Sequence, residues 1–406
     1  MFVEQSETRL RRVRIGFVLL CLVPTVGLVA WAFQRHSTAH RETMAAEATR
    51  LLSTEVAFES LRHLQPGCLR LSGVRLGGTS LGTVGVDTTP TEVRLLLDQC
   101  ECSPAFAGQL ATLARRWLTE PARFPQNCVI DIAGMAWKTA AGDVVTVQPL
   151  RVECVANAGD RAVRIISPER TTDEMRIVRT AEPATTLDQS HWEVDVTLTA
   201  PMPMAVILAV LGQSPLAGWQ LGTEAVVTGT MQTKVTADGW VGHASGRMVG
   251  VDLEAVTARL PYRAEGLATL EIAGLIWANN RVSAAELSMV SPRGTLAQEW
   301  LDGLISIIGC RAAPAAMKKG DAELREFEQL ALRVAVDGSG ARLRAEPHRA
   351  GCLMESQGIP LVFEPPAAVT LDRLAWLLSG TRVAAVPGTP VSAWLLSVLP
   401  LPQTNR

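Results

Sequence analysis

Apolar and polar residues alternate along much of this chain, and three ten-residue segments share one variant of that alternation. The segments are GCLRLSGVRL at 67–76, CVIDIAGMAW at 128–137 and ATLEIAGLIW at 268–277. In each, the alternation slips by one residue at a glycine and then resumes, which is typical of a strand with a bulge or bend at that glycine. We therefore predict repeated β units that each bury one face.

The alternating apolar residues of these segments are the candidates for lining a groove or filling a core. They are Leu69, Leu71, Ile130, Ile132, Trp137, Leu270, Ile272 and Trp277. Bulges at Gly73, Gly134 and Gly274 would curve the sheet that carries them. A second interpretation stays open, in which the same faces pack against one another or against helices as an ordinary core.

Helical patterns are fewer and short. Ser103 is a typical N-cap followed by Pro104, and apolar residues then recur at helical spacing, which predicts a helix over 104–118. Similar patterns predict helices over 203–211 and 296–308. A final pair is expected over Thr370–Leu378 and Thr389–Leu399, where it could close the open edge of the last β unit.

An uncharged run from Ile15 to Phe33 follows a short basic N-terminus. At about 1.5 Å per residue, a helix of this length spans roughly the 30 Å hydrocarbon core of a bilayer. Arginines before the run predict that the N-terminus is cytoplasmic and that the following residues lie outside. A cleaved signal peptide is the alternative, because Ala30-Trp31-Ala32 has the form of a cleavage site, but the run is longer than a usual signal core. We expect a retained single-pass anchor in the inner (cytoplasmic) membrane, with the bulk of the chain in the periplasm.

These elements predict a mainly β (α+β) protein: an N-terminal transmembrane helix, an elongated and curved antiparallel β-repeat body with a few short packed helices, and a C-terminal helix pair. Weak breaks in the pattern at 170–190 and 311–321 divide it. The expected parts are a cytoplasmic N-terminus over 1–14, the anchor over 15–33, β-repeat regions over 51–185 and 190–310, and a C-terminal β unit with terminal helices over 322–406.

Composition is that of a folded and nearly neutral protein, with 48% hydrophobic residues, 19% charged residues and a net charge of −2. No basic stripe is interleaved with aromatic residues, so nucleic acid is not an expected partner.

Cysteines allow one specific pairing to be predicted. Cys128 and Cys154 are equidistant from Ala141, the centre of the turn that should follow the second repeat strand. They are therefore expected to be cross-strand neighbours and a candidate disulfide, although a bulge would shift the register by one residue. The Cys100-Glu101-Cys102 pair has no second pair at metal-ligand spacing, so no metal site is predicted.

The search for catalytic motifs finds one formal match, Gly78-Thr79-Ser80-Leu81-Gly82, which fits G-x-S-x-G. A nucleophile elbow needs a strand, a sharp turn and a helix, whereas the residues after this motif have a strand pattern. Histidines are scattered singly, and neither a Walker loop nor a G-x-G-x-x-G is present. We predict a non-enzymatic protein without cofactor or metal; an anchored hydrolase using Ser80 is the remaining enzymatic alternative.

The order of a basic N-terminus, one transmembrane helix and a long β body resembles that of the AsmA-like proteins, relatives of TamB in the repeating-β-groove group. The unit LEIAGLIW followed by AELSM is similar to their repeats, and FEQLALRVAVDGSGARLRA at 327–345 is similar to their final β unit. This chain departs from the pattern in being shorter than the large bridging members and in carrying helices within the body.

The resemblance implies lipid transport or outer-membrane biogenesis in a two-membrane envelope, with membrane lipids as partners. Burying an acyl chain in an apolar β groove would stabilise it by about 0.8 kcal/mol per CH₂. The alternative is a membrane-anchored scaffold that binds another envelope protein through a sheet edge or the C-terminal helices.

Overall fold

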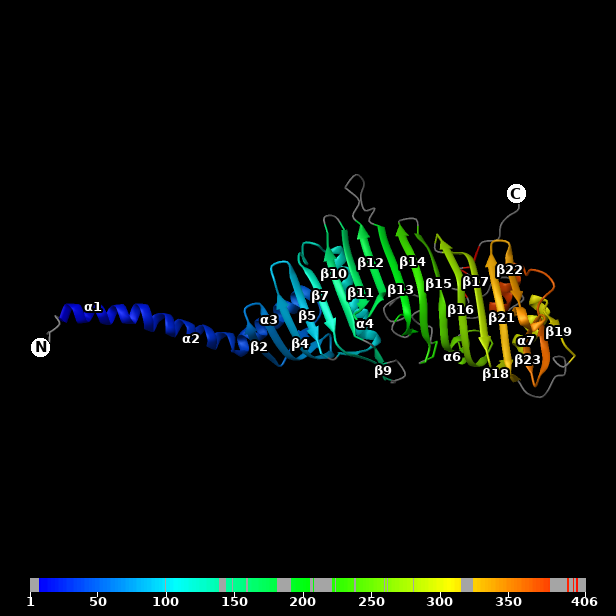
Figure 1. The fold of residues 1–406 in the computed structure, drawn as a ribbon, viewed down its shortest axis with the longest axis horizontal. Coiled ribbons are helices and arrows are strands. Elements are labelled where there is room, and N and C mark those ends of the chain that lie inside the picture. The colour runs from blue at the N-terminus through cyan, green and yellow to red at the C-terminus, as the bar shows by residue number, and fades with distance from the viewer. Residues whose placement is uncertain are drawn as a thin grey trace.

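A long helix at one end and a large β-sheet make up most of the structure (Figure 1), which is a computed structural model of the chain. It describes residues 7–400 apart from 99, 139–143, 148, 158–159, 181–190, 205–206, 208–220, 223, 237–238, 259, 261, 280, 315–323, 380–392, 394–396 and 398. The predicted helices over 203–211 and 389–399 fall largely outside these residues.

The N-terminal helix comprises α1 (Glu7–Phe17), the π-helical turn η1 (Val18–Leu22) and α2 (Val23–Arg35). Pro24 explains the π turn, because proline cannot donate to the carbonyl four residues earlier and its ring crowds that carbonyl. Residues 11–35 are long and apolar enough to span a membrane. The expected single N-terminal anchor is thus supported in length and composition.

Helix α3 (Thr38–Leu52) joins the N-terminal helix to the sheet, and the side chain of Ser37 caps the N-terminus of α3. Arg35 at the end of α2 donates to His63 Nδ1 on an edge strand at 3.3 Å, and Arg41 donates to the carbonyl of Glu59 at 2.5 Å. These bonds attach the helical segment to the first edge of the sheet.

The main sheet runs from that edge to the far end of the molecule, and its strands pair mostly with their neighbours in sequence. Its first half consists of β1 (Val56–Ala57), β2 (Ser60–Gln65), β3 (Cys68–Leu76), β4 (Thr79–Thr88), β5 (Glu92–Leu97), β7 (Asn127–Ile132), β10 (Leu150–Ala156), β11 (Asp160–Ser167), β12 (Arg170–Thr180) and β13 (His191–Pro203). The second half consists of β14 (Val226–Thr236), β15 (Gly239–Asp252), β16 (Ala264–Ala278), β17 (Arg281–Ser291), β18 (Gly294–Ala297), β19 (Arg311–Ala312), β20 (Leu324–Phe327), β21 (Gln329–Asp337), β22 (Gly340–Arg344), β23 (Cys352–Ser356) and β24 (Ile359–Phe363).

One parallel pair interrupts this antiparallel order, between β5 and β7. A parallel pair needs a crossover, and α4 (Pro104–Thr119) supplies it in the segment predicted as helix 104–118. Ser103 caps this helix as expected by accepting from the backbone N–H of Phe106. A small separate sheet of β6 (Cys100–Cys102), β8 (Met135–Lys138) and β9 (Val144–Val147) lies beside the crossover.

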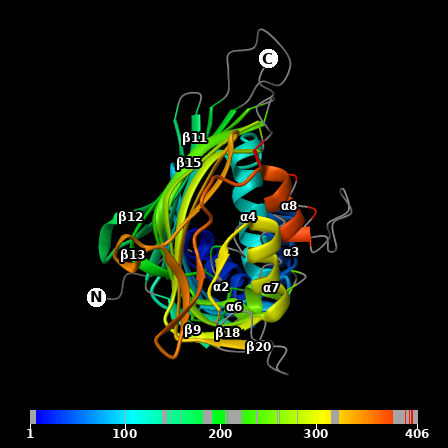
Figure 2. The same cartoon turned by 90° about the vertical axis from the view of Figure 1, so that its right-hand side faces the viewer.

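The remaining helices are α6 (Leu253–Thr257), α7 (Gln298–Gly303), the π turn η3 (Leu304–Ile308), the 3₁₀ turn η4 (Pro347–Arg349) and α8 (Leu371–Ser379). The predicted helix over 296–308 begins two residues late, because residues 294–297 pair as β18 with β16 and β20. Figure 2 shows the main sheet as a bent wall with α4, α7 and α8 on one side. We call that side the inner face and the opposite side the outer face.

The three glycine positions have different outcomes. Register shifts surround Gly73 in β3 and occur at Gly274 in β16, so these two are bulges within strands. Gly73 has a φ of +64°, a left-handed conformation that favours glycine. At Gly134 the expectation of a bulge is wrong, because β7 ends at Ile132 and the chain then joins the small sheet as β8.

The main sheet is continuous across the two predicted breaks. Strand β12 pairs with β13 on either side of 181–190, and β17 pairs with β21 on either side of 315–323.

Candidate functional site

An unbroken row of apolar side chains crosses the inner face from β3 to β22. Each residue is the direct register partner of the next, and alternate residues of a strand share a face. The row is Leu69, Val86, Leu95, Ile130, Val152, Ile165, Met175, Val196, Met231, Ala244, Leu275, Ala285, Val336 and Ala341. With strands about 4.8 Å apart, it is on the order of 60 Å long.

Seven of the eight residues predicted from the glycine-containing segments lie in this row or beside it on the same face. Leu71 and Ile132 follow Leu69 and Ile130 at alternate positions. On β16, Leu270 and Ile272 precede the bulge at Gly274 and lie on the same face as Leu275, which belongs to the row. Trp137 is the exception, because it lies on β8 in the small sheet; its side chain is outside the described residues.

Trp277 lies across the inner face rather than standing upright on it. Its indole N–H donates to Thr233 Oγ1 at 3.2 Å, although the strand of Gly242 separates the two residues. A Cβ atom on Gly242 would meet the Trp277 ring at 2.7 Å, so the glycine is what allows the ring to cross.

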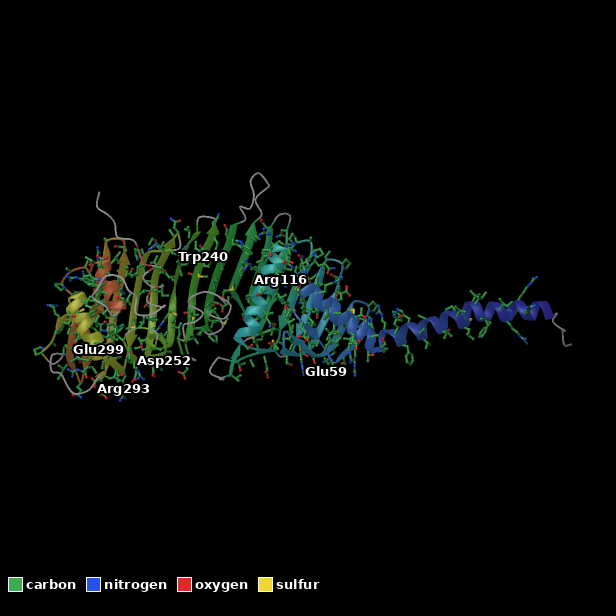
Figure 3. All side chains as sticks on the ribbon, turned by 180° about the vertical axis from the view of Figure 1, so that it is seen from behind. Glu59, Arg116, Trp240, Asp252, Arg293 and Glu299 are labelled. Atoms are coloured by element: carbon green, nitrogen blue, oxygen red, sulfur yellow. The ribbon has the colours of Figure 1, made fainter. Side chains whose placement is uncertain are left out.

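Helices cover the two ends of the inner face. Phe106 and Leu110 of α4 pack with residues of β3, β4, β5 and β7, and Leu301 of α7 and Leu377 of α8 pack with residues of β17 and β21. In Figure 3 these helices lie in front of the sheet, with Arg116 marking the C-terminal part of α4.

The middle of the inner face is less covered by the described helices. Helix α4 contacts β11, and Ile177 of β12 and Trp192 of β13 pack against the cluster formed by its last residues, Trp117 and Leu118. Helix α6 contacts β15 and β16, and the rest of β12, β13 and β14 has no extensive contact with the described helices. Met175, Val194 and Met231 are only half-buried there, whereas Val196 and Thr233 are buried. This section therefore presents apolar side chains that the described helices do not bury.

The outer face carries charged residues in cross-strand pairs. Asp131 on β7 is bonded by Arg94 at 2.8 Å and by Arg151 at 2.6 Å, and Arg164 on β11 bonds Glu174 at 2.8 Å and Glu153 at 3.4 Å.

The pKa of Asp131 reflects these contacts. Burial favours the neutral acid, but the hydrogen bonds from Arg151 and Arg94 outweigh it and lower the pKa. The sheet is thus amphipathic, with one apolar face and one charged face.

Cys128 and Cys154 are direct register partners on β7 and β10, as their common distance from Ala141 predicted. Both are free thiols in this structure, and they pack in one cluster with Trp117 at the end of α4. Burial is the main cause that raises the pKa of Cys128 to about 11 and that of Cys154 to about 12. Neither thiol is a ready nucleophile at neutral pH.

Two arginines interrupt the apolar inner face, and sequence analysis did not identify them. Arg161 on β11 and Arg179 on β12 are register partners beside the C-terminus of α4. The signal in the sequence was the segment from Met175 to Arg179, where alternation places an arginine at an inner position after two apolar residues.

Ser80 has no catalytic surroundings in the described part of the chain. It lies exposed on β4, opposite Arg75 in the hairpin with β3, and no helix follows it. The described residues also contain no group of three or more His, Cys, Asp or Glu side chains arranged to hold a metal ion.

Comparisons with protein-family models, with curated proteins and with solved structures found no match for this chain.

Proposed function

We propose that this chain is a non-enzymatic, membrane-anchored protein of the cell envelope that binds lipids and passes them along the inner face of its sheet. The observation that carries the proposal is the apolar row from Leu69 to Ala341, which is on the order of 60 Å long and is backed by a charged outer face. An acyl chain on this surface would gain about 0.8 kcal/mol for each buried CH₂. The pattern-level resemblance to AsmA-like proteins supports the same function.

The anchor gives the proposal a location. We infer that the helix over 11–35 crosses the inner membrane with its N-terminus in the cytoplasm and the sheet in the periplasm. Because α3 and the edge strand β2 follow the anchor directly and contact it, the first edge of the sheet would then lie next to the membrane surface.

Native mass spectrometry of the full-length protein, released from detergent micelles, tests the proposal. We expect masses of bound phospholipid on the protein as purified. A charge in the middle of the inner face should remove them, and Met231→Lys introduces one. Gln232→Lys is the matched control, because it places the same charge one residue away on the outer face.

The two variants must first show similar thermal unfolding, so that loss of lipid is not loss of fold. Repeated absence of lipid from the wild-type protein would overturn the proposal and favour the scaffold alternative. Equal lipid occupancy in Met231→Lys and Gln232→Lys would show that lipid binds elsewhere.

A further inference from the structure

Arg161 and Arg179 place two positive charges on a face that is lined mainly by apolar side chains. Arg161 is 8% exposed, and its guanidinium lies 4.0 Å from the centre of the Trp117 ring. Arg179 stands next to it on β12, and Trp192 follows as the next register partner on β13. The pair lies near the strand ends, one residue from the first residue of β11 and one from the last residue of β12.

The hydrogen bonds of this pair go to carbonyl groups. Arg161 donates to the carbonyls of Trp117 and Phe124, and Arg179 donates to the carbonyl of Leu118 at 3.2 Å. These contacts cap the C-terminus of α4, which is a structural role in itself. Each guanidinium has five N–H donors, so the three bonds leave donors for a further acceptor.

Among the described residues, the charges around the pair do not balance. The C-terminus of a helix supplies roughly half a negative charge, against the two positive charges of the arginines. In the described part of the chain no carboxylate pairs with either arginine, and Glu120, which follows α4, pairs with Arg123 instead. Burial is the main cause that lowers the pKa of Arg161, and the like charge of Arg179 acts in the same direction. An anion at this position would therefore be stabilised.

The surroundings indicate what kind of anion fits. On the inner face, Ile177 and Val194 come next to Arg179 and Trp192 along their strands, and Met175 and Val196 follow. Ile177 and Trp192 pack against the cluster of Trp117 and Leu118 and Val196 is buried, whereas Met175 and Val194 are half-buried. A phosphate held by the arginines at the strand ends would remain near water, while hydrocarbon attached to it would run down the half-buried middle section of the inner face.

We propose that Arg161 and Arg179 bind the phosphate of an anionic phospholipid whose acyl chains lie on the inner face of β12 and β13. This inference rests on the proposed lipid-binding function and adds the position and charge of the headgroup. Since the described residues of the site carry an excess of positive charge, it should prefer phosphatidylglycerol to the zwitterionic phosphatidylcholine.

Titration of the full-length protein in detergent with dioctanoyl phosphatidylglycerol and dioctanoyl phosphatidylcholine, read by native mass spectrometry, tests the preference. We expect Arg179→Gln to weaken phosphatidylglycerol binding about tenfold, the loss expected for one hydrogen bond to a charged group. Phosphatidylcholine binding should change little. Arg176→Gln is the matched control, because Arg176 lies on the same strand, is exposed and faces the outer side.

Arg161 needs a conservative variant because it caps α4, and Arg161→Lys keeps the charge while removing the paired donors. We expect this variant to unfold within a few degrees of the wild type and to bind phosphatidylglycerol more weakly. A separate arm with inorganic phosphate distinguishes a lipid headgroup from a free ion. Displacement of the lipid by phosphate alone at comparable affinity would overturn the lipid assignment.

The outcomes separate this inference from the function on which it rests. Equal binding of the two lipids by the wild type, or unchanged phosphatidylglycerol binding in Arg179→Gln, would overturn the headgroup site and leave lipid binding intact. Failure of the wild type to bind either lipid would overturn both.

Discussion

Oxidation of Cys128 and Cys154 should stabilise the sheet by a calculable amount. The two residues are direct cross-strand partners, so their Cβ atoms lie at the separation typical of such pairs, about 4.5–5.5 Å, from which a small adjustment reaches disulfide geometry. The bond would close a loop of about 27 residues. The loop-entropy relation then gives about 3.5 kcal/mol of stabilisation, through restriction of the unfolded chain.

Reactivity determines how the experiment is done. With pKa values of about 11 and 12, almost none of either thiol is ionised at neutral pH, and only the thiolate exchanges with a disulfide. We therefore expect slow oxidation of the folded protein and efficient oxidation during refolding with oxidised glutathione. In that exchange two protein thiols lose two electrons, and glutathione disulfide is reduced to two thiols.

Peptide mapping without reductant, followed by thermal unfolding with and without reductant, gives the readout. For a body of this size, about 3.5 kcal/mol corresponds to a midpoint roughly 5 °C higher in the oxidised form. Cys154→Ser should abolish this difference. Cys68→Ser should preserve it, because the register partners of Cys68 are Gln65 and Asp87. Absence of the Cys128–Cys154 peptide after oxidative refolding, or equal midpoints with and without reductant, would refute the reasoning.

Three further predictions concern stability and are read by denaturant or thermal unfolding. Asp131→Asn should cost about 1 kcal/mol at neutral pH, because its ion pairs are partly exposed. The folded-state pKa of Asp131 is lowered, so the contribution of its carboxylate to stability is complete above the unfolded-state pKa and disappears as the pH falls through the folded-state pKa. The stabilities of the variant and the wild type should therefore converge in acid. A constant difference in stability across pH would contradict this. Gly242→Ala should destabilise the sheet by about 1–3 kcal/mol, since the new Cβ would lie 2.3 Å from the backbone oxygen of Gln232. Gly274→Ala should be nearly neutral, because a Cβ at that position would have no atom within 4 Å. Equal effects of the two substitutions would disprove the packing argument. Leu301→Ala, at a site with 0% exposure, should cost about 2–5 kcal/mol, and a loss below 1 kcal/mol would mean that this core can collapse around the gap.

The alternation of apolar residues predicted the inner face well because it is a local property. Leu69 and Leu71, like Leu270 and Ile272, lie on one face wherever their strand pairs, since the side-chain period of a strand is two. A similar local count predicted that Cys128 and Cys154 would be cross-strand neighbours. The register of β7 with β10 is symmetric about position 141, and nothing in that count required knowledge of the rest of the fold.

Identical local patterns nevertheless had different outcomes. Trp137 and Trp277 occupy the same place in their ten-residue segments, yet Trp277 crosses the inner face of the main sheet and Trp137 lies in the small one. The difference arises after Gly134, where β8 pairs with β6 and β9 instead of continuing β7. Which strands become neighbours depends on distant segments, and no ten-residue pattern contains that information.

The candidate headgroup site could not have been found without the tertiary structure. Arg161 and Arg179 are far in sequence from Trp117 and Leu118, which they contact respectively, and these contacts form only because α4 crosses over between two parallel strands and ends beside β11 and β12.

The sequence by itself determined the apolar N-terminal helix, the β character of the body, the cross-strand pairing of Cys128 with Cys154, and the capped start of α4. Each of these features depends on periodicity, length or a short-range hydrogen bond. The tertiary structure decided that one apolar row is continuous from β3 to β22 and that two arginines share its edge. Those features depend on long-range strand register, which is set by the packing of the whole sheet and its helices.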